Sequence, residues 1–205
     1  MATTASPYGL KAVNHIGGTP YAGSTRLLPI ASGYAVNIYY GSIVQIAAAG
    51  TIEIVTVTGN GGGGAAASFP AGTIGVFVGV TYTDPNLGTV VFRQSFPTGT
   101  VATDIQAYII DDPDVIFMAQ ADAAVTQADL GQNTHLAAVQ STTTGSTTTG
   151  NSNSAVDATT ATTNTFAFRI VDFVDSPTST VGDAFTDLLI KFNAGVHSYD
   201  NATGI

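Results

Sequence analysis

The densest group of side chains that could bind a metal ion is an acidic cluster in the middle of the chain. Asp111, Asp112 and Asp114 lie close together around Pro113. Carboxylates carried on a turn are ligands that a hard cation such as calcium accepts. The remaining ligands of an EF-hand loop are missing, however. We therefore interpret the cluster as a solvated hairpin turn and predict no metal site there.

Other ionisable side chains that could form a site are scattered along the sequence. His15, His135 and His197 are far apart, so a metal triad would require the fold to bring them together. In strands, carboxylates usually mark the solvent face or cap a turn, although pairs of them could face each other across a hairpin. Two such pairs occur: Asp172 with Asp175, and Asp183 with Asp187.

The sequence lacks the motifs of the common catalytic mechanisms. It contains no cysteine, so thiolate nucleophiles, thiolate metal sites and disulfides are excluded. No Gly-x-Ser-x-Gly elbow and no His-Glu-x-x-His motif are present. Nothing singles out two aspartates as the acid and base of a glycosidase. We predict a binding or structural module with no catalytic residues and no cofactor, because such a module needs only shape, sheet edges and apolar surface.

Charge and hydropathy narrow the possible partners. The 205 residues include 5 Lys+Arg and 14 Asp+Glu, which gives a formal net charge of -9. Five scattered cations cannot neutralise many phosphates, so we expect no direct binding to nucleic acid. The mean hydropathy of +0.28 is too apolar for a disordered chain, yet no apolar run is long enough to span a membrane. The first residues also lack the pattern of a secretory signal.

The elements that must position these side chains are predicted to be strands. Thr, Val, Ile, Tyr and Phe favour strands, whereas the Glu and Lys of helical surfaces are nearly absent, and Glu53 is the one glutamate. Short apolar runs alternate with glycine-containing turns. We expect a mainly β protein: an antiparallel β-sandwich or small β-barrel with an extended N-terminal arm and at most one or two short helices. Strand-like runs occupy residues 26–31, 34–40, 42–47, 51–58, 73–83, 89–96, 105–110, 115–121, 165–174 and 184–193.

Turn residues predict how some of these strands connect. Residues 84–88 (Asp-Pro-Asn-Leu-Gly) suit a tight turn between the strands at 73–83 and 89–96. Residues 111–114 suit a second hairpin. Gly75 and Gly79 within one strand suggest a bulge or a close backbone approach. Residues 121–131 are the best candidate for a helix. The Gly-rich segment 59–68 and the Ser/Thr/Gly segment 141–153 are expected to be flexible, exposed loops.

The first 25 residues are predicted to form an extended arm, followed by a β-rich domain over residues 26–205. Frequent Pro and Gly prevent a helix or a long strand in this segment. Apolar side chains recur between them at Tyr8, Leu10, Val13, Ile16 and Tyr21. Such a segment either wraps its own domain or grips a neighbouring molecule.

Several stretches resemble small virion proteins of tailed bacteriophages. They begin at Ala5 (Ala-Ser-Pro-Tyr-Gly-Leu-Lys), Ile30 (Ile-Ala-Ser-Gly-Tyr-Ala), Gly75 (Gly-Val-Phe-Val-Gly-Val-Thr-Tyr-Thr-Asp-Pro) and Val181 (Val-Gly-Asp-Ala-Phe-Thr-Asp). Within that group, the size and the arm are similar to those of capsid decoration, or cement, proteins. These are small, β-rich, often trimeric, and bound outside the head by an arm that adds to a strand of the shell protein.

The resemblance implies a location, partners and binding residues. The protein would be made in the cytoplasm of the bacterial host and would reside on the capsid surface of the virion. Its partners would be the major capsid protein and further copies of itself, with a trimer favoured over a dimer, and with no membrane involved. An extended arm can add to a sheet edge while its side chains fill pockets. The candidate capsid-binding residues are Tyr8, Leu10, Lys11, Val13, Ile16 and Tyr21.

Two other functions are kept as alternatives. One is a virion-surface adhesin or tail-associated protein that binds host glycans, with residues 141–153 as a display loop. The other is a polysaccharide-degrading β-protein, for which only aspartates such as Asp111, Asp112 and Asp114 could be the catalytic groups.

Overall fold

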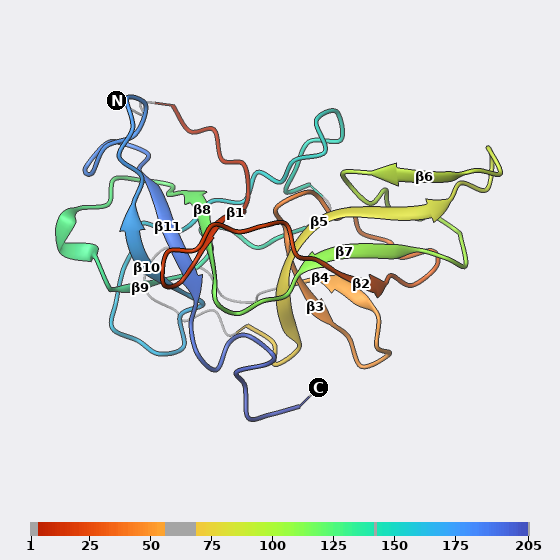
Figure 1. Cartoon of the computed structure of the whole chain (residues 1–205). Coiled ribbons are helices and arrows are strands. Elements are labelled where there is room, and N and C mark those ends of the chain that lie inside the picture. Colours follow the sequence, from red (N-terminus) through yellow and green to blue (C-terminus); the bar gives the residue numbers. More distant parts are fainter. Residues whose placement is uncertain (1–3, 56–68, 142, 205) are drawn as a thin grey trace.

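The computed structural model describes residues 4–55, 69–141 and 143–204, and these residues form two antiparallel sheets (Figure 1). The mainly β fold predicted from composition is confirmed and is consistent with a sandwich. The predicted loop at 59–68 lies outside the described residues. No described helix is long and apolar enough to cross a membrane.

The first sheet contains five strands in the order β1-β8-β11-β10-β9. Apolar side chains alternate along its central strands, so that one face of β11 is fully buried. The bounds are β1 Lys11–His15, β8 Val115–Gln120, β9 Asn133–Thr134, β10 Phe168–Phe173 and β11 Asp187–Phe192.

The second sheet contains six strands in the order β2-β7-β5-β3-β4, with β6 also paired to β5. Its longest strand, β5, pairs with β7 through its middle residues, and with β3 and β6 at its two ends. The bounds are β2 Arg26–Pro29, β3 Ile43–Ile46, β4 Ile52–Ile54, β5 Thr73–Thr83, β6 Val90–Arg93 and β7 Gln106–Ile110.

The second sheet has buried residues on both of its faces. Ile43, Val76 and Ile110 face the first sheet and join the larger core cluster. Their neighbours Phe77 and Ile109 point to the other side and pack in a second cluster beneath residues 30–38 and 96–105. The protein therefore has two hydrophobic core clusters, one between the two sheets and one between the second sheet and a layer of loops.

The turn at 84–88 forms the predicted hairpin, since Thr83 of β5 pairs with Val90 of β6. The turn at 111–114 does not form one, and that prediction is wrong. It carries the chain from β7 in the second sheet to β8 in the first, where β8 pairs with β1 and β11. A local Asp-Pro sequence specifies a reversal of direction but not the strand that will be paired next.

Two other local predictions need correction. The helix expected at 121–131 is reduced to one 3-10 turn, Gln127–Asp129, in which Asp129 accepts hydrogen bonds from the backbone and side chain of Thr126. The strand expected at 34–40 forms only isolated bridges, one from Ile38 to Phe96 and one from Tyr40 to Asn151. Both segments nevertheless pack against the sheets, since Ile38 lies in the second cluster with Phe77 of β5, and Val125 lies in the larger cluster with Leu188 of β11.

Candidate interaction surface

The second sheet extends beyond the area that the first sheet covers (Figure 1). Ile110 of β7 faces the first sheet. Tyr108, two residues earlier, lies on the same face of the second sheet, but the first sheet does not extend over it. The strand register places Leu27 of β2 and Phe92 of β6 on this same face, because Leu27 pairs with Tyr108 of β7 and Phe92 pairs with Thr81 of β5. We call the uncovered area formed by Leu27, Val90, Phe92 and Tyr108 the overhang.

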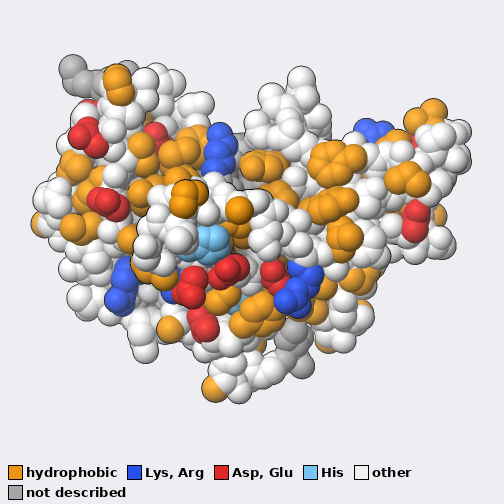
Figure 2. All heavy atoms as spheres, in the orientation of Figure 1, with side chains coloured by type: hydrophobic (Ala, Val, Ile, Leu, Met, Phe, Trp, Pro, Cys, Tyr) orange, Lys and Arg blue, Asp and Glu red, His pale blue; other side chains and the backbone are white. Residues whose placement is uncertain are grey.

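The overhang is the end of the molecule where exposed hydrophobic side chains gather. In Figure 2, hydrophobic side chains lie over the region where Figure 1 draws β2, β5, β6 and β7. Among the described residues, three of the five most exposed large hydrophobic side chains belong to the overhang: Val90 (71%), Phe92 (65%) and Leu27 (50%). Such a concentration is typical of an interaction surface, whereas single exposed hydrophobic residues are normal.

Gly79 creates the space in which Phe92 lies. A Cβ atom at position 79 would come within 2.6 Å of the Phe92 ring, so a larger residue there would displace the ring from this position. The same ring meets Tyr108 edge-on, with centroids 5.6 Å apart and an interplanar angle of 67°. The prediction for this strand is met in another way, since the register shifts between Phe77 and Gly79 and the Ile110 carbonyl approaches Gly75 closely.

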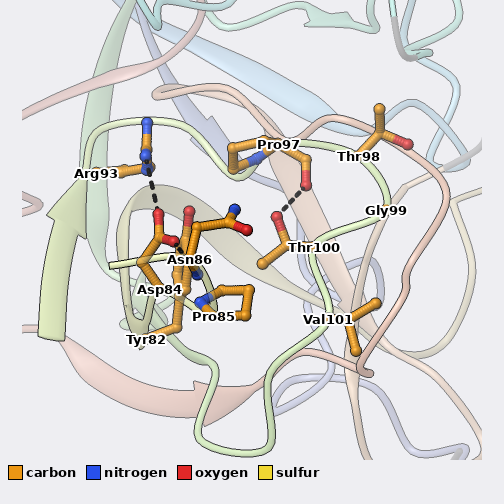
Figure 3. A pocket seen from close by; sticks show the side chains of 10 residues that line it. All are labelled: Tyr82, Asp84, Pro85, Asn86, Arg93, Pro97, Thr98, Gly99, Thr100 and Val101. Atoms are coloured by element: carbon orange, nitrogen blue, oxygen red, sulfur yellow. Dashed lines mark hydrogen bonds and ion pairs between the residues drawn. The ribbon is translucent and has the colours of Figure 1, made fainter. Parts of the chain in front are cut away.

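A hollow of about 450 Å³ adjoins β6 (Figure 3). On one side the Arg93 guanidinium lies 3.5 Å from the Asp84 carboxylate, and on the other the 97–101 loop contributes Thr100 and Val101. Hydrogen bonds from the backbone N–H groups of Asn86 and Leu87, together with the nearby Arg93, hold the pKa of Asp84 below its usual range. Asp84 is thus an ionised turn cap that anchors Arg93.

The predicted N-terminal arm is in part a strand of the body. Leu10 is only 1% exposed and lies in the larger core cluster, and β1 pairs with β8. The Tyr8 hydroxyl donates to Asp187 at 3.0 Å, and the Lys11 ammonium lies 4.2 Å from the Tyr8 ring centroid. Burial is the largest cause of a raised pKa at Tyr8, and the Asp187 carboxylate adds to it.

The other candidate residues of the arm differ in their exposure. Val13 and Ile16 are exposed, whereas Tyr21 is half-buried against the core. Burial raises the pKa of Tyr21 to about 12, and its hydroxyl donates to the carbonyl of Ser24. Of the six residues predicted to bind the capsid, only Val13 and Ile16 therefore present exposed apolar side chains.

The acidic turn at 111–114 is an ion-pair network. Asp111 accepts from Arg26 Nε at 2.7 Å, and Asp114 lies 3.0 Å from Lys191 Nζ. Asp112 lies 3.4 Å from His15 Nε2. Figure 2 shows a group of acidic side chains with basic ones on either side. The carboxylates thus fasten the crossover to β1, β2 and β11 of both sheets.

The three histidines lie in different places. His15 contacts Asp112, while His135 is buried with its Nε2 3.6 Å from Asp157 and its ring against Phe166. His197 is buried beside Phe192, and this burial lowers its pKa. Within the ranges that the structure describes, no three His, Asp or Glu side chains gather into a group that could hold a metal ion.

The segment expected as a display loop at 141–153 packs more closely than predicted, although Thr142 is outside the described residues. Gly145 lies against the buried ring of Tyr39, where a Cβ would come within 2.3 Å. Gly145 also bridges to Ser152, which is buried, and Tyr40 bridges to Asn151. Among the described residues of this segment, Thr143, Asn153 and the tip at 147–149 are exposed. The segment is therefore a docked hairpin-like loop with a short exposed tip.

Comparisons with known proteins add no identification: no protein-family model, curated protein or solved structure matches this chain.

Proposed function

We propose that this chain is a non-enzymatic virion structural protein that binds the outer surface of a phage capsid and stabilises the shell. The observation that supports an interaction role is the overhang, a core-like sheet face without a cover. Burying this face against another protein would remove Leu27, Val90 and Phe92 from water, which is the dominant favourable term in association. The phage setting is drawn from the sequence resemblance.

The position of Leu10 changes the proposed mode of binding. A side chain that completes the protein's own core cannot also fill a pocket in a shell subunit. We therefore assign the main contact with the shell to the overhang. The arm would add only a contact through Val13 and Ile16. The overhang carries the aromatic pair of Phe92 and Tyr108, and aromatic residues are common energetic centres of interfaces.

The test is binding of purified full-length protein to phage heads that lack it. We expect the unaltered protein to bind and to raise the thermal resistance of the heads, and Phe92→Ser and Leu27→Ser to bind at least about tenfold more weakly. Leu130→Ser and Val139→Ser are matched controls, since they remove exposed apolar side chains elsewhere on the surface. If the control variants lose binding and the overhang variants keep it, the overhang is not the contact. If no form binds heads, the decoration function is wrong.

One observation favours the glycan-binding alternative. A hollow of about 470 Å³ separates residues 6–11 from the 145–153 loop and is lined by hydroxyl, amide and ammonium groups, including Lys11, Ser146, Thr149 and Asn151. Such groups match the hydroxyls of a saccharide. Binding to host polysaccharide that is lost in Asn151→Ala but retained in Phe92→Ser would favour the adhesin over the decoration protein.

A further inference from the structure

The edges of the first sheet are covered by the chain itself. Beyond β1, the chain returns so that Tyr21 N–H donates to Val13 at 3.1 Å and His15 N–H donates to Thr19 at 2.8 Å. Beyond β9, Asn133 and Ala161 exchange two backbone hydrogen bonds of 2.8 and 2.9 Å. Covered edges of this kind cannot add a further strand.

Two edges of the second sheet are also blocked. At β4, the Ile54 N–H donates to the Tyr34 hydroxyl at 3.1 Å. At β2, Ile30 N–H donates to Ile105 on the β7 side, so strand alternation turns the preceding Pro29 toward the free edge. Proline has no N–H to offer there, which is a common way to protect an edge strand.

The edge of β6 has no such protection. Its only strand partner among the described residues is β5. The Thr89 carbonyl accepts from Asp84 N–H, and the Val91 carbonyl accepts from the Thr81 hydroxyl, so both point toward β5. Strand alternation therefore directs the peptide groups of Val90 and Phe92 to the open edge. Residues 89–94 contain neither Pro, Lys, Asp nor Glu.

We infer that β6 pairs antiparallel with β6 of a second copy of this chain, about a two-fold axis at Val91. In this register Val90 lies opposite Phe92 of the second copy, and each such pair exchanges both peptide hydrogen bonds. Directly opposite side chains lie on the same face, so the pairing also joins an exposed β-branched residue to an exposed aromatic one. The two overhangs then form one continuous surface.

Charge does not oppose a second copy at this edge. Two chains of net charge -9 repel each other, and they can approach most easily where no carboxylates meet. Residues 89–94 contain no acidic residue, and Arg93 is already beside Asp84 of its own chain. Because the antiparallel pairing of identical edges is two-fold symmetric, it closes as a dimer. A trimer would need β6 to pair with a different edge, and Pro29 opposes pairing at β2.

The first test is the molar mass of the full chain in solution, measured by sedimentation or light scattering over a wide concentration range. We expect twice the chain mass of 20.8 kDa for the unaltered protein and a shift to the single-chain mass for Val90→Pro. Proline is tolerated where an edge N–H faces solvent, and circular dichroism checks the fold. Leu27→Lys is the control, because it alters the overhang without touching the β6 edge, and it should remain a dimer.

The second test does not depend on the proline variant folding. Because the natural chain has no cysteine, a single Val91→Cys variant can cross-link only through the introduced thiol. Residues at the two-fold axis that do not share hydrogen bonds lie close enough for a disulfide. We expect oxidation to give a covalent dimer of Val91→Cys and none of Val139→Cys. A monomer or a trimer of the unaltered protein, a dimer that persists in folded Val90→Pro, or failure of Val91→Cys to cross-link would each overturn the inference. None of these readouts involves phage heads, so they are independent of the proposed function.

Discussion

Replacing Phe92 by alanine should destabilise the protein much less than replacing Phe77, but should weaken binding much more. Both are phenylalanines of the second sheet, one in β6 and one in β5. Phe77 is fully buried, and Phe92 is 65% exposed. The pair therefore compares the same chemical change on a covered and an uncovered face.

The expected change in unfolding free energy for each variant follows from how deeply the side chain is buried. Truncating a buried phenylalanine to alanine costs about 3–5 kcal/mol of unfolding free energy, which is the expectation for Phe77→Ala. Roughly a third of the Phe92 side chain is covered, so Phe92→Ala should cost about 1–1.5 kcal/mol, including its edge contact with Tyr108. If Phe92 is an energetic centre of the interface, its loss should weaken binding by about 2 kcal/mol, or roughly thirtyfold.

Urea unfolding measures the first quantity and binding to heads measures the second. Tyr108→Phe is a useful control, since it keeps the aromatic pair and removes only a hydroxyl. If Phe92→Ala unfolds as easily as Phe77→Ala, the ring belongs to the core and the uncovered face has been misjudged. If Phe92→Ala binds heads as well as the unaltered protein, the face is not the contact.

Three further predictions concern the body of the protein. Leu10→Ala should lower the unfolding free energy by about 2–4 kcal/mol, measured in urea, because Leu10 is a core residue; a change below about 0.5 kcal/mol would be typical of a free arm. Gly145→Ala should lower thermal stability, with an expected cost of about 1–3 kcal/mol, because its Cβ would meet the buried Tyr39 ring; an unchanged melting temperature would show that the loop is not docked there. Burial lowers the folded-state pKa of His197 below its usual 6.5, so the unfolded chain binds a proton first, and stability should be constant above that pH and fall as the pH drops toward the folded pKa. His197→Phe should flatten this part of the profile, measured by urea unfolding at several pH values, and an equal slope in both proteins would exclude His197 as its source.

The sequence allowed prediction of features set by neighbouring residues. Residues 84–88 contain their own turn chemistry, and Gly79 marks a shift in strand register, so both could be predicted locally. The destination of the 111–114 turn could not, because it depends on β8 pairing with β1 and β11. Strand pairing between distant segments is decided by packing of the whole sheet and not by the turn itself.

The overhang was missed for a related reason. Tyr108 and Ile110 occupy equivalent positions in the same alternating pattern, yet only Ile110 is covered by the first sheet. The alternation of side chains shows which residues share a face, but the extent of the opposing sheet decides which of them reach water. A signal for it was the run Thr89-Val-Val-Phe-Arg-Gln, where adjacent apolar residues occur without a proline and the one charged residue, Arg93, follows them.

The pairing of β1 with β8 has a consequence for synthesis on the ribosome. Lys11 and its partner Met118 are separated by about 100 residues of chain. At translation rates of about 5–20 residues per second, β1 leaves the ribosome roughly 5–20 s before its partner strand has been made. During that interval Leu10 has no core to enter, and the edge of β1 can meet other nascent chains. The yield of folded protein should therefore depend on chaperones that keep the first residues from binding other nascent chains until β8 emerges.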